Sequence, residues 1–181
     1  MGKDIDRRLI RIIKKQNVKI AKLQKKLTLD FGTGVLNKGQ GFLKLKQHME
    51  LCNKKNLPMT IAFVDVDNLK KVNDKFGHCE GDKLLKRIAT IIRRNIREYD
   101  FVFRYGGDEF IVVFRNADIR KAKKIWERVK KKIYEENTIR RRPYIISITV
   151  GFAGYTDNIS LQELIEFADK NMYRNKPLQM I

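Results

Sequence analysis

Cysteine, proline and long apolar runs are scarce in this chain of 181 residues. The two cysteines, Cys52 and Cys79, lie far apart and lack the spacing of a metal site. This argues against a disulfide framework and favours a reducing compartment. The N-terminal segment alternates charged and apolar residues, so it is neither a secretory signal nor a membrane span. We therefore expect a cytoplasmic protein, or the cytoplasmic part of a larger one, with no membrane span in this chain.

Acidic residues are also few: 21 stand against 40 Lys and Arg, which gives a formal net charge of +19. Such a surplus is typical of proteins that bind a polyanion, whether nucleic acid, an anionic membrane surface or a phosphorylated substrate. A lysine-rich solvated surface explains the charge equally well. The length, with 43% apolar residues, suits one domain with a proper core and leaves little room for a second.

Residues 1–27 have the pattern of an amphipathic helix. Apolar residues recur at steps of three and four, or sums of them: Ile5, Leu9, Ile12, Ile20, Leu23 and Leu27. This stripe is typical of a short coiled coil, although the polar Gln16 interrupts it, and packing on its own domain is the alternative. Two glycines, Gly32 and Gly34, mark a turn after the helix. We divide the chain into this helix and a domain at 28–181.

The rest of the chain alternates helical and extended patterns. Apolar periodicity predicts helices over 41–56, over Leu84 to Ile96, over 117–136 and after Ser160, which opens a capping box with Glu163. Runs rich in β-branched and aromatic residues predict strands at 60–66, 101–105, 110–114 and 144–153. The order β-α-β-β-α-β, with extra helices at both ends, predicts an α+β fold of the ferredoxin-like, palm type: a central antiparallel sheet flanked by helices.

Two carboxylates are expected to meet at one end of this sheet. Asp65 ends the first strand, and Asp108 lies in the hairpin turn of the two central strands. In this topology the first strand lies beside the hairpin, so the two carboxylates can converge. Paired carboxylates suit Mg²⁺, because this ion takes hard oxygen ligands and leaves room for substrate phosphates. Gly106 and Gly107 allow a ligand to approach the backbone closely. The pattern predicts a Mg-nucleotide site; two unrelated solvated acids in turns are the alternative.

Three motifs, in order, resemble those of GGDEF-domain diguanylate cyclases. The sequence Arg-Tyr-Gly-Gly-Asp-Glu-Phe at 104–110 matches the family signature. Residues 65–82 resemble the family's substrate segment, and Asp30, Thr33, Gly34 and Asn37 match its opening motif. The resemblance covers about Leu27 to Lys176. It implies that 28–181 is a catalytic domain that condenses two GTP molecules into cyclic di-GMP and releases pyrophosphate.

The resemblance implies a role for each matching acidic residue. Asp65, Asp108 and the carbonyl of Val66 hold the metal, Mg²⁺ or alternatively Mn²⁺, and Glu109 is the adjacent acid that binds a second ion. Asp108 is also the family's proposed base for the attacking 3′-hydroxyl, although a metal-bound carboxylate is a compromised base. The metal itself can instead lower the pKa of that hydroxyl.

The resemblance also implies which residues bind GTP. Guanine is read by an amide and a carboxylate, Asn73 and Asp82, which match its donors and acceptor. His78 belongs to the same pocket pattern, with packing in its loop as the alternative. Lys70 and Lys176 neutralise the triphosphate. Backbone amides at Asn68, Leu69 and Lys70 add phosphate donors at a helix start.

Association and feedback follow from the same resemblance. One GTP is bound per subunit and two subunits face each other, so catalysis requires a homodimer. Arg97 and Asp100 form an R-x-x-D sequence that resembles the inhibitory binding site for the product, cyclic di-GMP. The alternative is a pair at a helix end in which Asp100 holds Arg104.

Two other functions compete with a cyclase. A catalytically silent domain that senses GTP or cyclic di-GMP would usually have lost part of the set Asp65, Asp108 and Glu109, which is intact here. A nucleic-acid-binding module would stack bases on exposed aromatic residues of the sheet. The strand aromatics form no such motif, so we expect no nucleic-acid partner.

Overall fold

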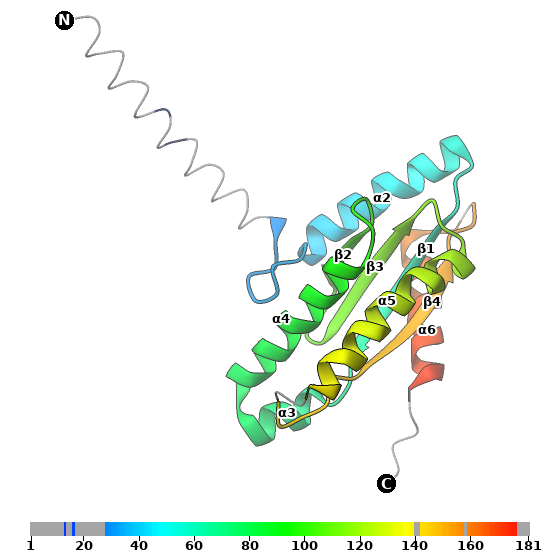
Figure 1. Ribbon diagram of the computed structural model, residues 1–181. Helices are drawn as coiled ribbons and strands as arrows, with labels where there is room; N and C mark the ends of the chain where they lie inside the picture. The colour runs from blue at the N-terminus through cyan, green and yellow to red at the C-terminus, as the bar shows by residue number, and fades with distance from the viewer. Residues whose placement is uncertain (1–12, 14–15, 17–27, 140–141, 158, 177–181) are drawn as a thin grey trace, which may run out of the picture.

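The computed structural model describes residues 13, 16, 28–139, 142–157 and 159–176. Its elements are α2 (Lys38–Lys55), β1 (Met59–Val66), α3 (Leu69–Phe76), α4 (His78–Asn95), β2 (Phe101–Arg104), β3 (Glu109–Arg115), α5 (Ile119–Thr138), β4 (Ile148–Gly154) and α6 (Leu161–Asn175), as Figure 1 shows. The helix predicted for 1–27 lies outside the described residues, except for Ile13 and Gln16. The described helices include none long and apolar enough to cross a bilayer.

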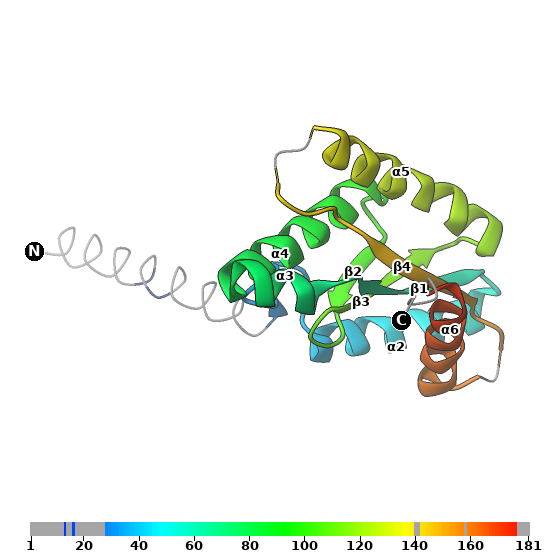
Figure 2. The same ribbon diagram turned by 90° about the horizontal axis from the view of Figure 1, so that it is seen from below.

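The four strands form one antiparallel sheet in the order β2-β3-β1-β4. This is the strand order of the ferredoxin-like fold, and the predicted fold class is confirmed. Helices α4 and α5 cover one face of the sheet, and α2 and α6 cover the other (Figure 2). In this strand order β1 lies between β3 and β4, in the interior of the domain.

Side-chain alternation along β1 divides the core into two layers. Ala62, Val64 and Val66 belong to the cluster under α4 and α5, whereas Ile61 and Phe63 belong to the cluster under α2 and α6. Successive side chains of a strand point to opposite faces, so a strand buried on both faces is apolar along most of its length; Thr60 and Asp65 are the polar exceptions in β1. All eight residues of β1 are buried.

The last helix packs directly on the last strand. A Cβ added at Gly151 would overlap the backbone of α6 at Ala168 and Met172. Only glycine permits this close approach. It brings the C-terminal end of α6, with Lys176, to the end of β1.

Several element boundaries differ from the sequence prediction, and a side-chain hydrogen bond accounts for two of the differences. The strand β4 begins at Ile148 rather than at Tyr144. The backbone of Ile146 instead exchanges two hydrogen bonds with the side chain of Asn137, at 2.9 and 2.8 Å. The helix α2 begins earlier than 41 because the Asn37 side chain caps it, accepting from the Gln40 amide at 3.0 Å. The capping box of α6 at Ser160 is confirmed.

Candidate active site

The end of β1 and the β2–β3 hairpin meet at one point of the sheet. Asp65 stands opposite Glu109 in the β1–β3 register. One residue further, the Val66 amide donates to the Asp108 carbonyl at 3.0 Å. Because β1 lies beside β3, the pair Asp65 and Val66 meets the pair Asp108 and Glu109, about forty residues later in the sequence.

The hairpin turn fixes the position of Glu109. Its carbonyl accepts from the amides of Tyr105 at 2.8 Å and Gly106 at 3.4 Å. A Cβ added at Gly106 would lie 2.5 Å from Glu109 Oε2. Any larger residue at 106 would displace this carboxylate, so the glycine has a steric role in the site.

Arg104 braces the turn from outside. Its guanidinium donates to the carbonyls of Gly106 at 3.1 Å and Gly107 at 2.6 Å, and it pairs with Asp30 at 3.2 Å. Asp30 in turn accepts from the amide and the hydroxyl of Thr33, at 2.9 and 2.6 Å. The opening motif and the signature motif are thus parts of one hydrogen-bonded unit.

Negative charge accumulates around Asp65, which is only 8% exposed. Burial raises the pKa of Asp65, the hydrogen bond and charge of Lys176 oppose this rise, and the charges of Asp108 and Asp67 add to it. The pKa of Glu109 is also raised, by burial and then by Asp108 and Asp65. Lys176 lies 3.1 Å from Asp65; burial opposes its charge, but the hydrogen bond to Asp65 and the nearby carboxylates outweigh that and raise its pKa. The site stabilises positive charge.

The substrate segment continues directly from β1. Asn68 has a left-handed backbone (φ 59°) and begins α3, and its carbonyl accepts from the Val72 amide at 3.0 Å. Asparagine tolerates this conformation better than most residues. Leu69 and Lys70 form the first turn of α3, and Lys70 is exposed.

The corner between α3 and α4 holds the residues predicted to read guanine. A Cβ at Gly81 would overlap the side chain of Asn73, so this side chain lies against α4. Asp82 follows Gly81 on α4, and both Asp82 and His78 are exposed. In the described part of the chain no hydrogen bond joins Asn73 to Asp82 or His78. The structure thus places Asn73 beside Gly81, which precedes Asp82. The carboxylate of Asp82 and the imidazole of His78 are both exposed to solvent.

Arg97 and Asp100 form a closed ion pair at the end of α4. The guanidinium donates to both carboxylate oxygens at 2.8 Å, and Asp100 is 6% exposed. Asp100 also accepts from the Arg115 amide at 3.0 Å, and Arg97 donates to the Arg115 carbonyl at 2.6 Å. The alternative pairing of Asp100 with Arg104 is wrong, because Arg104 binds Asp30.

Residues 27–180 match the family model described as diguanylate cyclase, GGDEF domain. The chain belongs to the GGDEF family. It is 33% identical to diguanylate cyclase DosC of Escherichia coli K12 over 150 residues, which covers 80% of this chain and 32% of DosC. Diguanylate cyclase A of Treponema denticola is 32% identical over 154 residues, covering 82% of this chain and 42% of the relative. The chain thus spans about a third of DosC.

Solved GGDEF structures share the fold. The GGDEF domain of PA1120 (TpbB or YfiN) from Pseudomonas aeruginosa is 29% identical, with a TM-score of 0.73, and covers 82% of this chain and 88% of that chain. The coiled coil and GGDEF domain of DgcB from Caulobacter crescentus, in complex with c-di-GMP, is 22% identical with a TM-score of 0.80, covering 91% and 88%. At the latter identity the likeness shows the fold alone.

GGDEF diguanylate cyclases are generally metal-dependent, and the donor set of this GGDEF domain fits a hard cation. Among the described residues, no three His, Cys, Asp or Glu side chains already form a metal-binding cluster. Mg²⁺ does not need three, because it is commonly held by one or two carboxylates together with water and substrate phosphates. Asp65 already attracts one cation, the Lys176 ammonium.

Asp67, the second carboxylate after β1, has a different task from Asp65. Its oxygens accept from Ser147 at 2.5 Å and Thr149 at 2.7 Å, and its amide donates to the Ser147 carbonyl at 3.1 Å. Asp67 therefore fastens the end of β1 to the start of β4. The Ser-x-Thr spacing at 147–149 was the available signal, but it has no meaning without the register between the strands.

Tyr144 was also missed by the sequence reasoning. Its hydroxyl donates to Glu80 at 3.0 Å, and its ring lies 5.8 Å from that of Phe76. Burial and the bond to Glu80 raise the pKa of Tyr144 to about 12, so it remains a donor at neutral pH. It supports the first turn of α4, which leads into Gly81 and Asp82. The contact spans 64 residues and leaves no local signal.

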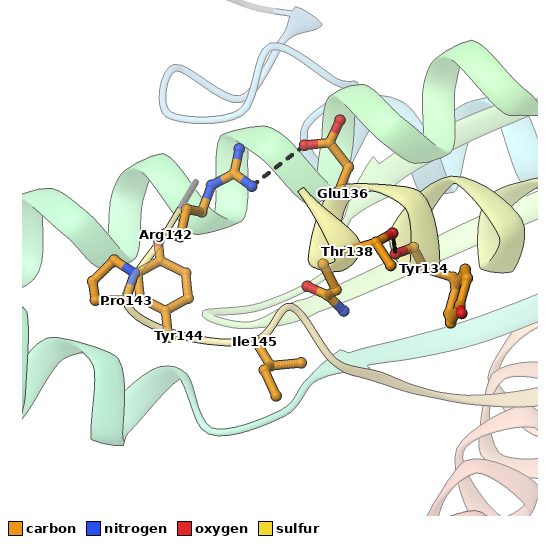
Figure 3. Close-up of a pocket in the computed structure, with 8 residues that line it drawn as sticks. Tyr134, Glu136, Thr138, Arg142, Pro143, Tyr144 and Ile145 are labelled. Atoms are coloured by element: carbon orange, nitrogen blue, oxygen red, sulfur yellow. Dashed lines mark hydrogen bonds and ion pairs between the residues drawn. The ribbon is translucent and has the colours of Figure 1, made fainter. Parts of the chain in front are cut away.

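The loop that carries Tyr144 is anchored to α5. Arg142 pairs with Glu136 at 3.3 Å, and Figure 3 shows this pair beside the loop. A hollow of about 600 Å³ lies between the loop and the end of α5. Its lining includes Tyr134 and Ile145 but none of the predicted metal ligands, so this hollow is separate from the carboxylate site.

Proposed function

We propose that this GGDEF domain is a diguanylate cyclase, which condenses two GTP molecules into cyclic di-GMP and releases pyrophosphate. The observation that carries the proposal is the convergence of Asp65, Asp108 and Glu109 at the hairpin, with the backbone of Val66 bonded to that of Asp108. Named diguanylate cyclases among the relatives support it. Because the chain spans only part of those relatives, the proposal concerns the activity of this domain.

We infer that Asp65, Asp108 and the Val66 carbonyl hold Mg²⁺, or alternatively Mn²⁺, with Glu109 available to a second ion. When bound, the ion would neutralise phosphate charge and lower the pKa of the attacking hydroxyl. Asp108 would orient that hydroxyl. The Lys176 ammonium, which lies 3.1 Å from the Asp65 carboxylate, would leave that carboxylate and bind the triphosphate when GTP is present.

Lys70 would add a second positive charge to the triphosphate, and the amides of Asn68, Leu69 and Lys70 at the start of α3 would donate to it. At the other end of GTP, Asn73 and Asp82 would bind guanine, with His78 beside them. Gly107 is exposed in the turn, where a phosphate can approach the backbone. Catalysis would then consist mainly of positioning and charge neutralisation.

The reaction joins two nucleotides, so we propose a homodimer with one GTP per subunit. The 3′-hydroxyl of each GTP attacks the α-phosphorus of the other, so that two phosphodiester bonds form and two pyrophosphates leave. A monomer would bind GTP without completing the product. GTP as the substrate and two free cysteines, Cys52 and Cys79, agree with a cytoplasmic location.

We also propose that Arg97 and Asp100 bind the product as a feedback inhibitor. Their groups now satisfy each other and the backbone of Arg115. A cyclic dinucleotide would have to open this pair, taking the guanidinium for a phosphate or guanine and the carboxylate for a guanine edge. The cost of opening it would limit inhibition to high product concentrations.

The test is chromatographic detection of cyclic di-GMP after incubation with GTP and Mg²⁺. Asp108→Asn should lower the rate about a hundredfold or more, as removal of a group that stabilises transition-state charge does. Glu127→Gln, an exposed acid on α5, is the matched control and should retain the parent rate. Absence of product from the parent, with GTP or cyclic di-GMP still bound, would show a sensor domain and contradict the proposal.

A further inference from the structure

The proposed GTP site uses little of the chain's charge surplus. Its triphosphate cations are Lys70 and Lys176, whereas the net charge is +19. The helix α5, with eight basic and three acidic residues, carries a net +5 of the charge that remains. Between Ile119 and Lys132 this helix carries one acidic residue, Glu127, and eight basic ones: Arg120, Lys121, Lys123, Lys124, Arg128, Lys130, Lys131 and Lys132.

The geometry of α5 turns these cations outward. The helix buries a stripe against the sheet that includes Ala122, Trp126 and Val129. At 100° per residue, Arg120, Lys124 and Lys131 lie on the opposite face, and all three are exposed. Figure 2 shows α5 as the outermost layer on its side of the sheet.

Few of these charges are neutralised within the protein. Lys130 pairs with Glu127 and Lys132 with Glu135, at 3.0 and 3.1 Å, but these are exposed pairs that contribute little. Arg120 lies 4.0 Å from Asp118 in a third exposed pair. Five others have no acidic partner among the described residues: Lys121, whose ammonium donates to the Asn116 carbonyl, and Lys123, Lys124, Arg128 and Lys131. Their charge is available to an external anion.

Exposed apolar side chains adjoin the basic residues at the C-terminal end of α5. Tyr134 is 70% exposed, and Ile145 in the following loop is 76% exposed. Both line the hollow of Figure 3. Steps of seven and four residues place Lys123, Lys130 and Tyr134 on one flank of the helix.

We propose that the α5 face docks on an anionic lipid surface. The α5 face comprises Arg120, Lys123, Lys124, Lys130, Lys131, Tyr134 and Ile145. Its lysines would approach the headgroups, and its two apolar side chains would enter the boundary between headgroups and acyl chains. Peripheral docking of this kind needs no membrane span.

The apolar component favours lipid over nucleic acid as the polyanion. Surfaces that bind single strands interleave cations with several aromatic rings that stack on bases. Along the α5 face Tyr134 is the one exposed aromatic residue in the described part of the chain, and Ile145 offers a base nothing to stack on. An aliphatic side chain gains free energy in a bilayer by leaving water.

Docking through α5 would leave the carboxylate end of the proposed active site away from the lipid. Asp65 alternates with Val64 and Val66, so its side chain points to the α2 and α6 face, where it meets Lys176. The α5 face lies on the other side of the sheet (Figure 2). In a bound domain the carboxylates would therefore face the solution.

Vesicle flotation tests the proposal directly. The whole chain should bind vesicles of phosphatidylcholine with phosphatidylserine, and not phosphatidylcholine alone. Neutralising Lys123, Lys124 and Lys131 to Gln should weaken binding about fivefold per lysine, or about a hundredfold together. Lys46, Lys54 and Lys55→Gln on α2, which are also exposed, remove the same charge and should change binding little. Circular dichroism checks that both triple variants fold.

A second variant separates insertion from simple attraction. Ile145→Ser should weaken binding several-fold, and this loss should persist as salt is raised, because burial of apolar surface is not screened. Equal losses in the α5 and α2 variants would show that only net charge matters and would overturn the proposal. Undiminished binding by the α5 variant would also overturn it, as would α5-dependent binding to RNA or duplex DNA without binding to vesicles.

Discussion

The two faces of the sheet use charge in opposite ways. On the α2 and α6 face, carboxylates are gathered at the hairpin, where burial and mutual repulsion raise the pKa values of Asp65 and Glu109. On the α4 and α5 face, lysines are spread along one exposed helix. Charges that share a buried site interact strongly, whereas exposed charges are screened. The first arrangement suits catalysis, and the second suits attraction to a surface.

The contrast between the two faces of the sheet is tested most strongly by neutralising Asp65. Asp65→Asn should lower cyclic di-GMP formation about a hundredfold or more, because it removes a proposed ligand of the metal ion that would neutralise phosphate charge. Without divalent ions its thermal stability should be unchanged or higher, because the raised pKa means that folding disfavours the Asp65 carboxylate. Activity assays and thermal melts in chelator provide the two readouts. A clearly less stable Asp65→Asn protein would contradict the account of a strained acidic cluster.

His48 shows a third way of handling charge, in which a buried group remains neutral. Burial lowers its pKa to about 4, helped by the charges of Arg115 and Lys44, and its imidazole accepts from Arg115. The unfolded chain protonates near pH 6.5, so the folded state should lose stability as pH falls from about 6.5 to about 4, by at most about 3 kcal/mol. Denaturant unfolding at several pH values measures this loss.

The matched variants for this test are the two histidine-to-glutamine changes. His48→Gln should make the stability flatter over that pH range, whereas His78→Gln, at an exposed position, should leave the parent's profile unchanged. If both variants have the parent's profile, His48 is not the titrating group.

A smaller effect is expected at Tyr144, which supports the proposed guanine pocket. Tyr144→Phe removes the bond to Glu80 and loosens the first turn of α4, so KM for GTP should rise about fivefold, the equivalent of about 1 kcal/mol. The value of kcat should stay within about twofold of the parent's, since the carboxylate site is untouched. Tyr134→Phe, with its exposed ring, is the control. A fall in kcat with unchanged KM would argue against this role for Tyr144.

The smallest effect belongs to the exposed face. In the Lys130–Glu127 pair the side chains are 59% and 64% exposed. A double-mutant cycle with Lys130→Ala and Glu127→Ala should give a coupling below about 0.5 kcal/mol, falling with salt. Chemical denaturation of the four proteins measures it. A coupling of several kcal/mol would remove the contrast between the two faces.

The sequence predicted what depends on local pattern and on motif spacing. The hairpin, the four strands and the cap at Ser160 follow from short-range signals, and the topology then brings Asp65 to Asp108. The contacts of Asp67 and Tyr144 could not be predicted, because each joins side chains more than sixty residues apart. The start of β4 was misplaced for a different reason, because the side chain of Asn137, only nine residues away, competes with the sheet for the Ile146 backbone.

The pairing of the two arginines teaches the same lesson. Both Arg97 and Arg104 are close in sequence to Asp100, and charge alone does not choose between them. The structure chooses Arg97, because Arg104 lies on β2 beside the turn and reaches Asp30 instead. Sequence reasoning therefore identified the candidate residues better than it identified their partners.

The measurement that tests the central claim most directly is the amount of cyclic di-GMP formed per subunit from GTP and Mg²⁺ over a dilution series of the protein. The account predicts that product is formed and that the rate per subunit falls on dilution, because each reaction centre needs two subunits. Absence of product at every concentration would contradict the cyclase, and a rate per subunit independent of dilution would contradict the two-subunit site.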